Sequence, residues 1–249
     1  GKSKNFQKII DIFPDKPKYV EVFGGSGAVL LNKKPVGNEV FNDIEKGLVS
    51  FYRCIQDPDK LAKLSAKLEQ TIHSRDFWNW CEAGMNYGDD IDRAFKWYYV
   101  TRFSFGQQGR AFGRSTGSYN ADSGKVRNSI PGFATLHKRL LRVLIECKGF
   151  RQIIQDFDSK DSLFYLDPPY LDTFRQAYKH GMGLEDHEDL LRLIGTCKGT
   201  VVISGYPNEL YDKQTYWTDR HTWTQEVLAR GTYQGNNYSI AEEVVWIKE

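Results

Sequence analysis

The sequence has few cysteines and no long apolar run. Its four cysteines are scattered, with no CxxC pair and no histidine at ligand spacing: Cys54, Cys81, Cys147 and Cys197. We therefore expect reduced, structural cysteines and no metal centre. No apolar stretch approaches the roughly 18 residues of a membrane helix, and no signal-peptide pattern is present. These absences predict a cytoplasmic protein with no membrane partner.

The net charge of +2 conceals a strong asymmetry along the 249 residues. The segment between Ile91 and Ile145 contains ten Lys or Arg and only two Asp, which gives it a net charge of +8 and leaves −6 for the rest of the chain. Aromatic residues are interleaved with these cations, and residues 106–118 form a Gly, Arg, Gln and Ser-rich loop without helical or strand periodicity. Such a segment suits contacts with phosphates and base edges of a polyanion. A solvated basic loop without a partner is the alternative.

A glycine turn follows the first predicted strand. Tyr19 to Phe23 is rich in β-formers, Gly24-Gly25-Ser26-Gly27 follows at once, and Ala28 to Leu31 can open a helix. This order lets the backbone approach a ligand closely at a helix N-terminus. The third glycine of the dinucleotide fingerprint is missing, which disfavours NAD. An ordinary turn after a strand is the alternative.

A second strand, Glu39 to Ile44, contains Asp43, which lies sixteen positions after Gly27. An acidic residue at the tip of the second strand is where α/β folds bind a ribose diol. The glycine turn after the first strand, the helix start that follows it and the acidic residue of the second strand together favour a cofactor that contains a nucleoside. Alternatively, Asp43 caps a helix over Glu45 to Gln56.

The central feature is Phe164-Tyr165-Leu166-Asp167-Pro168-Pro169-Tyr170. Two successive prolines cannot donate to a sheet, so the predicted strand must end at Asp167. An amine bound there could donate to the Asp167 carboxylate and the Pro168 carbonyl while Tyr170 stacks on its plane. Its lone pair would then be directed at an electrophile. A Pro-Pro turn with a local Asp cap is the alternative.

The remaining elements are predicted from periodicity and turn residues. We expect helices over residues 6–13, 61–68, 136–145 and 151–157, a helix capped by Asp186, and strands over residues 200–206, 223–229 and 242–248. The polar stretch Leu171 to Gly183 is expected to be a mobile flap. His187 is expected to be structural or at the substrate edge, because no nucleophile signature accompanies it.

Three motifs, Phe23-Gly24-Gly25-Ser26-Gly27, Asn42-Asp43-Ile44 and Asp167-Pro168-Pro169-Tyr170, resemble in this order those of the Dam-like, D12-class DNA adenine-N6 methyltransferases of bacteria and phages. The likeness covers nearly the whole chain. Gly1-Lys2 is similar to the end of the family's Gly-Gly-Lys segment, and the later motifs are matched by Asp186-His187-Glu188 and Ser204-Gly205-Tyr206.

The resemblance implies an α/β fold: a Rossmann-like methyltransferase sheet with helices on both faces and an inserted, mainly helical target-recognition subdomain. The catalytic domain would comprise residues 1–52 and 145–249, and the insertion residues 53–144. S-adenosylmethionine would be the methyl donor, S-adenosylhomocysteine the product, and no metal would be needed. The implied catalytic residues are Asp167, Pro168, Pro169 and Tyr170. The implied cofactor-binding residues are Lys2, Phe23, Gly24, Gly25, Ser26, Gly27, Asp43, Ile44, Phe150 and Asp167.

The implied reaction is methylation of adenine N6 in double-stranded DNA after the base has been flipped out of the duplex. We expect a monomer, or a dimer on DNA. The expected DNA contacts are Arg102, Gln107, Gln108, Arg110, Arg114, Lys125 and Arg127. The alternatives are an inactive DNA-binding protein of this fold and an amine methyltransferase acting on RNA or protein; cytosine-N4 methylation usually has Ser in place of Asp167.

The sequence departs from the family pattern in two places. Gly149 stands where the family commonly has an Asp before the Phe, here Phe150. The loop over residues 107–117 also lacks the Asn-rich pattern of GATC-reading members, so the resemblance implies no particular target sequence.

Overall fold

The computed structural model describes residues 6–104, 109, 111–113, 124, 126–171, 181–228 and 238–249, with the backbone alone for residues 225–228 and 238–240. The chain forms two compact units. The first comprises Gly1–Asn42 and Lys148–Glu249, and the second comprises Asp43–Cys147. Among the described residues, no helix is both long enough and apolar enough to cross a membrane.

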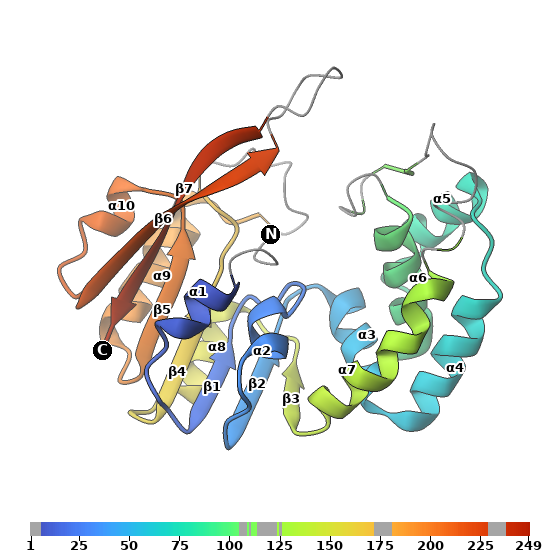
Figure 1. The fold of residues 1–249 in the computed structure, drawn as a ribbon, viewed down its shortest axis with the longest axis horizontal. Coiled ribbons are helices and arrows are strands. Elements are labelled where there is room, and N and C mark those ends of the chain that lie inside the picture. Colours follow the sequence, from blue (N-terminus) through green and yellow to red (C-terminus); the bar gives the residue numbers. More distant parts are fainter. Residues whose placement is uncertain are drawn as a thin grey trace. The chain divides into compact units, whose positions relative to one another are not determined.

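Within the described residues, the first unit contains six strands of a sheet, in the order β2-β1-β4-β5-β7-β6 (Figure 1). The parallel strands are β1 (Lys18–Glu21), β2 (Asn38–Asn42), β4 (Ser162–Leu166) and β5 (Thr200–Gly205). The antiparallel pair is β6 (Asp219–Leu228) and β7 (Tyr238–Lys248). β1 has β2 on one side and β4 on the other, so the strand order reverses here. Ligands of open α/β sheets bind beyond the carboxyl ends of strands at such a point.

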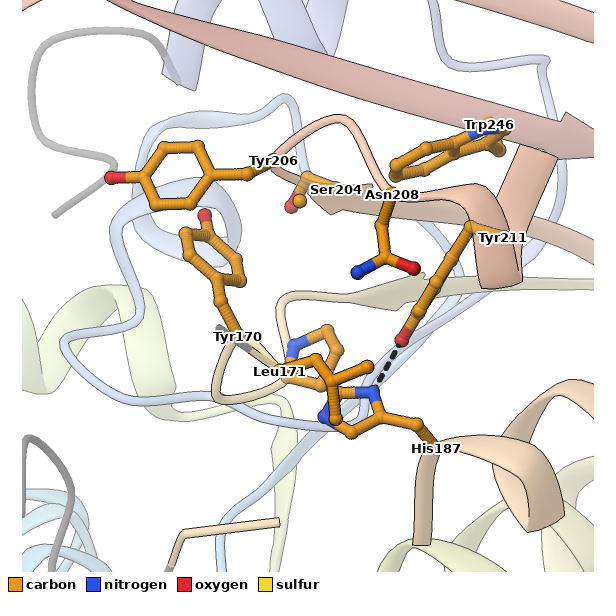
Figure 2. A pocket seen from close by; sticks show the side chains of 10 residues that line it. Tyr170, Leu171, His187, Ser204, Tyr206, Asn208, Tyr211 and Trp246 are labelled. Atoms are coloured by element: carbon orange, nitrogen blue, oxygen red, sulfur yellow. Dashed lines mark hydrogen bonds between the residues drawn. The ribbon is translucent and has the colours of Figure 1, made fainter. Parts of the chain in front are cut away.

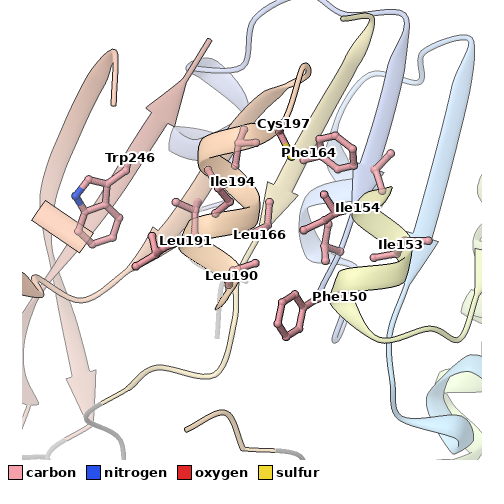
Figure 3. Packing of buried hydrophobic residues seen from close by; sticks show 14 of the residues in the cluster. Phe150, Ile153, Ile154, Phe164, Leu166, Leu190, Leu191, Ile194, Cys197 and Trp246 are labelled. Carbon is pink, nitrogen blue, oxygen red and sulfur yellow. The ribbon is translucent and has the colours of Figure 1, made fainter. Parts of the chain in front are cut away.

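Helices cover both faces of this sheet. On one face, α8 (Phe150–Phe157) and α9 (Leu184–Thr196) pack their apolar sides onto Phe164, Leu166 and neighbouring strand residues (Figure 3). On the opposite face lies the segment with α1 (Phe6–Asp11) and α2 (Ala28–Asn32), and the ring of Phe13 contacts those of Tyr19 and Tyr165. The short helix α10 (Glu209–Asp212) follows β5. The predicted Rossmann-like arrangement is confirmed.

The second unit is mainly helical. Its elements are α3 (Lys46–Gln56), α4 (Pro58–Glu69), α5 (Arg75–Ala83), α6 (Asp90–Arg102), the 3-10 helix η3 (Arg127–Gly132), α7 (Phe133–Leu140) and β3 (Val143–Glu146). Its core lies where α3 packs on α6: the rings of Phe51 and Tyr98 are stacked with centroids 4.7 Å apart. Gly47 permits this approach, because a Cβ there would lie 2.5 Å from the Cβ of Trp97.

Some expected boundaries differ from the structure. The helix predicted over residues 136–145 is wrong in its last part, because α7 ends at Leu140 and β3 begins at Val143. The β-branched Val143 and Ile145 are buried while Leu144 is exposed, the alternation of a strand. The units divide at 42/43 and 147/148, whereas the expected domain boundaries were 52/53 and 144/145; α3 packs with the second unit.

Two expectations concern the segment around the start of α9. The expected cap at Asp186 is wrong: the helix begins at Leu184 with Gly183 as its N-cap, and Asp186 is the third residue of the helix. Its Oδ2 accepts the Gly183 N–H at 3.1 Å, as a residue in the first turn can. Residues 172–180 of the expected flap lie outside the described residues.

Candidate active site

Asp167 emerges at the carboxyl end of β4 and its side chain is held by two hydroxyl groups. Ser204, the last residue but one of β5, donates to Asp167 Oδ1 at 3.2 Å, and the Tyr170 hydroxyl donates to the same oxygen at 3.1 Å. The two prolines end the strand, so the carboxylate projects beyond the sheet. The structure therefore brings together Asp167 and Tyr170, two of the four residues proposed as catalytic, and adds Ser204 as their neighbour.

The buried side chain of Tyr165 contacts Ser204, one of the two residues that hold the Asp167 carboxylate. The Tyr165 hydroxyl lies 3.1 Å from Ser204 Oγ. Burial, together with the nearby charge of Asp167, raises the pKa of Tyr165 well above its ordinary value. Tyr165 thus keeps its proton and donates it to Ser204, which leaves the Ser204 proton for Asp167 or for the Leu166 carbonyl at 3.3 Å.

A pocket lies beside the Asp167 turn, on its β5 side (Figure 2). The rings of Tyr170 and Tyr206 meet at its rim, with centroids 4.5 Å apart and planes at 63°. Deeper in the pocket, His187 Nδ1 lies 2.7 Å from the Tyr211 hydroxyl. Burial raises the pKa of Tyr211, so this hydroxyl keeps its proton at neutral pH. His187 thus braces Tyr211 within the pocket lining.

The glycine turn lies beyond β1, at the strand end adjacent to Asp167; the Val22 N–H donates to Tyr165 O at 3.0 Å. The Gly24 N–H donates to Asn42 O and the Gly27 N–H to Gly24 O, both at 2.8 Å. Gly27 adopts a left-handed φ of 64° immediately before α2. The predicted sequence of strand, turn and helix is thus present in the structure.

Glu21 is a buried carboxyl group that the sequence analysis missed. Its Oε2 accepts the Tyr19 hydroxyl at 2.7 Å and the Leu30 N–H at 2.8 Å, so it ties the first turn of α2 to β1. The pKa of Glu21 is raised to about 8: burial is the largest cause, the two hydrogen bonds oppose the rise, and the charge of Asp167 adds to it. A charged residue within the apolar run Tyr19-Val20-Glu21-Val22 was the available signal.

Glu21 makes stability depend on pH. The pKa of Glu21 is raised in the folded protein, so the folded state holds a proton that the unfolded state releases as pH rises from about 4.5 to about 8. Its contribution to the unfolding free energy is therefore greatest at low pH and falls by up to about 1.4 kcal/mol per pH unit within that window. Glu21→Gln should flatten this decline in urea unfolding measured from pH 5 to 8.

Glu209 offers the matched control, because its side chain is 90% exposed. Glu209→Gln should leave the pH profile of unfolding unchanged. A Glu21→Gln profile that parallels the wild-type profile would contradict a proton on Glu21 in the folded state.

Two aromatic rings border the glycine turn. The centroids of the Phe23 and Phe150 rings lie 6.0 Å apart, and the Arg151 guanidinium lies 4.5 Å from the Phe150 centroid. A Cβ added at Gly25 or at Gly149 would meet no described heavy atom within 4 Å. The two glycines thus leave open space next to two apolar rings, a surface on which a flat aromatic group could pack.

Asp43 and Ile44 follow directly after the end of β2 and belong to the second unit. Asp43 Oδ1 accepts the Glu45 N–H at 2.8 Å, and Ile44 is 52% exposed. The alternative in which Asp43 caps the following helix is wrong: α3 begins at Lys46 and is capped by Glu45, whose carboxylate accepts the Gly47 N–H.

Two of the predicted DNA contacts lie in the described part of the second unit. Arg127 donates from Nε to Glu69 O and from Nη2 to Thr71 O, both at 2.9 Å. The Arg102 guanidinium lies 5.8 Å from the centroid of the Tyr98 ring. Arg127 therefore also secures the end of α4. The other predicted site residues lie outside the described residues: Lys2, Gln107, Gln108, Arg110, Arg114 and Lys125.

Comparisons with known proteins agree that the chain is similar to DNA methyltransferases. The family model for D12 class N6 adenine-specific DNA methyltransferases matches residues 1–215. The Type II methyltransferase M.CviBI of Paramecium bursaria Chlorella virus NC1A is 25% identical over 231 residues, which cover 85% of this chain and 84% of the viral protein. The DNA N-6-adenine-methyltransferase of Escherichia phage P1 is 24% identical over 99% of this chain and 34% of its own length.

A solved structure named as a conserved hypothetical protein of Streptococcus pyogenes covers 100% of this chain and 96% of its own, with 11% identity and a TM-score of 0.37. That likeness is too low to support an argument about the fold.

Proposed function

Because the chain belongs to the D12 class N6 adenine-specific DNA methyltransferases, we propose that it methylates adenine N6 at the site formed by the Asp167 turn and the glycine turn. The supporting observation is the position of Asp167. It lies at the carboxyl end of β4, is oriented by Ser204, and is adjacent to the glycine turn that follows β1. The Asp167 turn and the cofactor-binding glycine turn would thus lie together at the point where the strand order reverses.

Asp167 and Pro168 act on the amine that is methylated. The Asp167 carboxylate and the Pro168 carbonyl accept the two N–H groups of the exocyclic amine, and the nitrogen lone pair is then directed away from both acceptors. The nitrogen gains positive charge as it is alkylated, and these two fixed acceptors stabilise that charge. S-adenosylmethionine supplies an electrophilic methyl group when bound.

The pocket beside β5 receives the target base. A paired adenine cannot reach the site, so the base must leave the duplex, at a cost of a few kcal/mol. Stacking on Tyr170 recovers part of this cost, because base–aromatic stacking is worth about 1–3 kcal/mol. Tyr206 meets the Tyr170 ring edge to face at 4.5 Å, so one of the two rings must turn as the base enters.

The cofactor residues are the glycine turn from Phe23 to Gly27, Phe150 and, after β2, Asp43 and Ile44. Phe23 and Phe150 supply an apolar surface and Asp43 supplies acceptors for the ribose hydroxyls. Lys2 completes this set. The second unit, Asp43–Cys147, contains the basic segment and would recognise DNA.

Transfer of labelled methyl from S-adenosylmethionine to unmethylated duplex DNA tests the proposal. We expect N6-methyladenine after digestion to nucleosides and mass analysis. Labelled N4-methylcytosine, or labelling of RNA in place of DNA, would contradict it. DNA binding without any transfer would indicate an inactive protein of the same fold.

Tyr170 tests the stacking role. Tyr170→Phe retains the ring and loses the hydroxyl bond to Asp167, so kcat/KM for DNA should fall by less than about tenfold, the value of one hydrogen bond. Tyr170→Ala also removes the ring, and kcat/KM should fall by a further ~5- to 150-fold, the value of one stacked base. Equal losses in the two variants would contradict stacking by this ring.

A further inference from the structure

Asn42, the last residue of β2, joins three segments of the candidate cofactor site. Its Nδ2 donates to the Val22 carbonyl at 2.9 Å and to the Lys148 carbonyl at 3.0 Å, and its Oδ1 accepts the Lys148 N–H at 2.9 Å. Its own carbonyl accepts the Gly24 N–H at 2.8 Å. With 1% of its surface exposed, Asn42 makes these contacts in the interior.

The set of partners specifies an amide at this position. Two backbone carbonyls require two N–H donors, and one backbone N–H requires an acceptor. Among side chains of this length only Asn carries both donors and an acceptor; Asp has no donor when ionised and Leu has neither group. The side chain of Asn42 is thus matched to the ends of two other segments.

These contacts lie where regular sheet pairing has stopped. The β1–β2 register ends at Glu21 opposite Phe41. Beyond it, Val22 leads into Phe23 and the glycine turn, and Lys148 leads into Gly149 and Phe150 at the start of α8. The two rings that meet at 6.0 Å, Phe23 and Phe150, each follow a segment that Asn42 holds.

We propose that Asn42 is a positioning residue that sets the affinity for S-adenosylmethionine. This inference rests on the proposed function. Asn42 touches neither reacting group; it acts through Val22 and Lys148, which fix the separation of the glycine turn and the start of α8. Loss of the amide's hydrogen bonds would let the two walls of the site move apart, and a binding site must be held close to its productive geometry by such supporting contacts.

Asn42→Asp is the sharpest test, because it preserves size and one acceptor while turning both donors into an oxygen that faces two carbonyls. A buried polar group left without its hydrogen-bond partner costs about 1–3 kcal/mol, which corresponds to a change of about 5- to 150-fold in an equilibrium constant. We expect the dissociation constant of S-adenosylhomocysteine and the KM for S-adenosylmethionine to rise at least about fivefold. The kcat at saturating S-adenosylmethionine and the KM for DNA should stay near wild-type values.

Asn38→Asp is the matched control: the same chemical change on the same strand, at an exposed position. It should bind S-adenosylhomocysteine like the wild type. Asn42→Ser introduces no buried charge and serves if Asn42→Asp fails to fold; it should raise the same two constants less. Calorimetry is run where circular dichroism shows each variant to be folded.

The outcomes separate the two proposals. Wild-type protein that neither binds S-adenosylhomocysteine nor transfers methyl overturns the proposed function. If the wild type binds, a folded Asn42 variant with unchanged affinity, or with reduced kcat and unchanged KM for S-adenosylmethionine, overturns the positioning role. A purely structural role would lower the amount of active enzyme and leave that KM unchanged.

Discussion

Asp167→Asn is expected to lower kcat for methyl transfer by about 10²-fold or more, the loss seen when one preorganised electrostatic contact is removed. Asn keeps an oxygen that can accept from Ser204 and Tyr170, so the turn should persist. Its amide nitrogen, however, cannot accept an N–H from the substrate amine and cannot stabilise positive charge on it. The measurement is the single-turnover rate of methyl transfer at saturating DNA and cofactor.

The dissociation constant of S-adenosylhomocysteine provides the control for Asp167→Asn, and it should change little. Ser204→Ala gives a graded comparison, because it leaves the carboxylate and removes one hydrogen bond to it; we expect a loss of roughly tenfold or less. Full turnover by Asp167→Asn would rule out Asp167 as the acceptor of the amine. A large loss of cofactor affinity with unchanged turnover would assign Asp167 to the cofactor instead.

The elements of the site were predictable because their signals are local. Two prolines must end a strand, and glycines before an apolar helix start indicate a tight turn wherever they occur. The helix predicted through Ile145 shows the limit of local signals: a short apolar run does not distinguish a helix end from a strand. Burial by neighbouring segments decides between helix and strand, and the alternation of buried and exposed side chains from Val143 to Ile145 is visible only in the folded structure.

The roles of Asn42, which belongs to the Asn42-Asp43-Ile44 motif, and of Glu21 were not predictable from the sequence for a different reason. Asn42 and Lys148 are 106 residues apart in the chain, and nothing near Asn42 indicates that it has this partner. Glu21 receives its capping bond from Leu30, and its raised pKa comes from burial that only the folded sheet creates. Long-range hydrogen bonds of single polar side chains leave no periodic trace.

The raised pKa of Glu21 also bears on the reaction. Glu21 is the last residue of β1 and Asp167 directly follows the adjacent strand β4, and the charge of Asp167 is one cause of the raised pKa of Glu21. A proton on Glu21 near neutral pH therefore removes a second negative charge from beneath the site. In the proposed mechanism, the field at the substrate amine would then come from the Asp167 carboxylate.

Gly24→Ala is expected to destabilise the first unit strongly and to disrupt the glycine turn. A Cβ at this position would lie 2.2, 2.4 and 2.8 Å from three ring atoms of Phe41, closer than real contacts allow. Phe41 is fully buried in β2, so its ring can move away only by displacing other residues of the core. We expect the unfolding free energy in urea to fall by about 1–3 kcal/mol, as overpacked cores do.

Gly25→Ala is the matched comparison one residue later. Its Cβ would meet no described heavy atom within 4 Å, and its φ of 50° makes alanine cost about 1–2 kcal/mol. The loss of unfolding free energy has a different cause in each variant. Phe41→Leu should restore part of the loss in Gly24→Ala, with a coupling energy of about 0.5–3 kcal/mol, because it removes the clashing ring. It should not restore the loss in Gly25→Ala. Equal responses to Phe41→Leu would show that the Phe41 ring does not set the path of the turn.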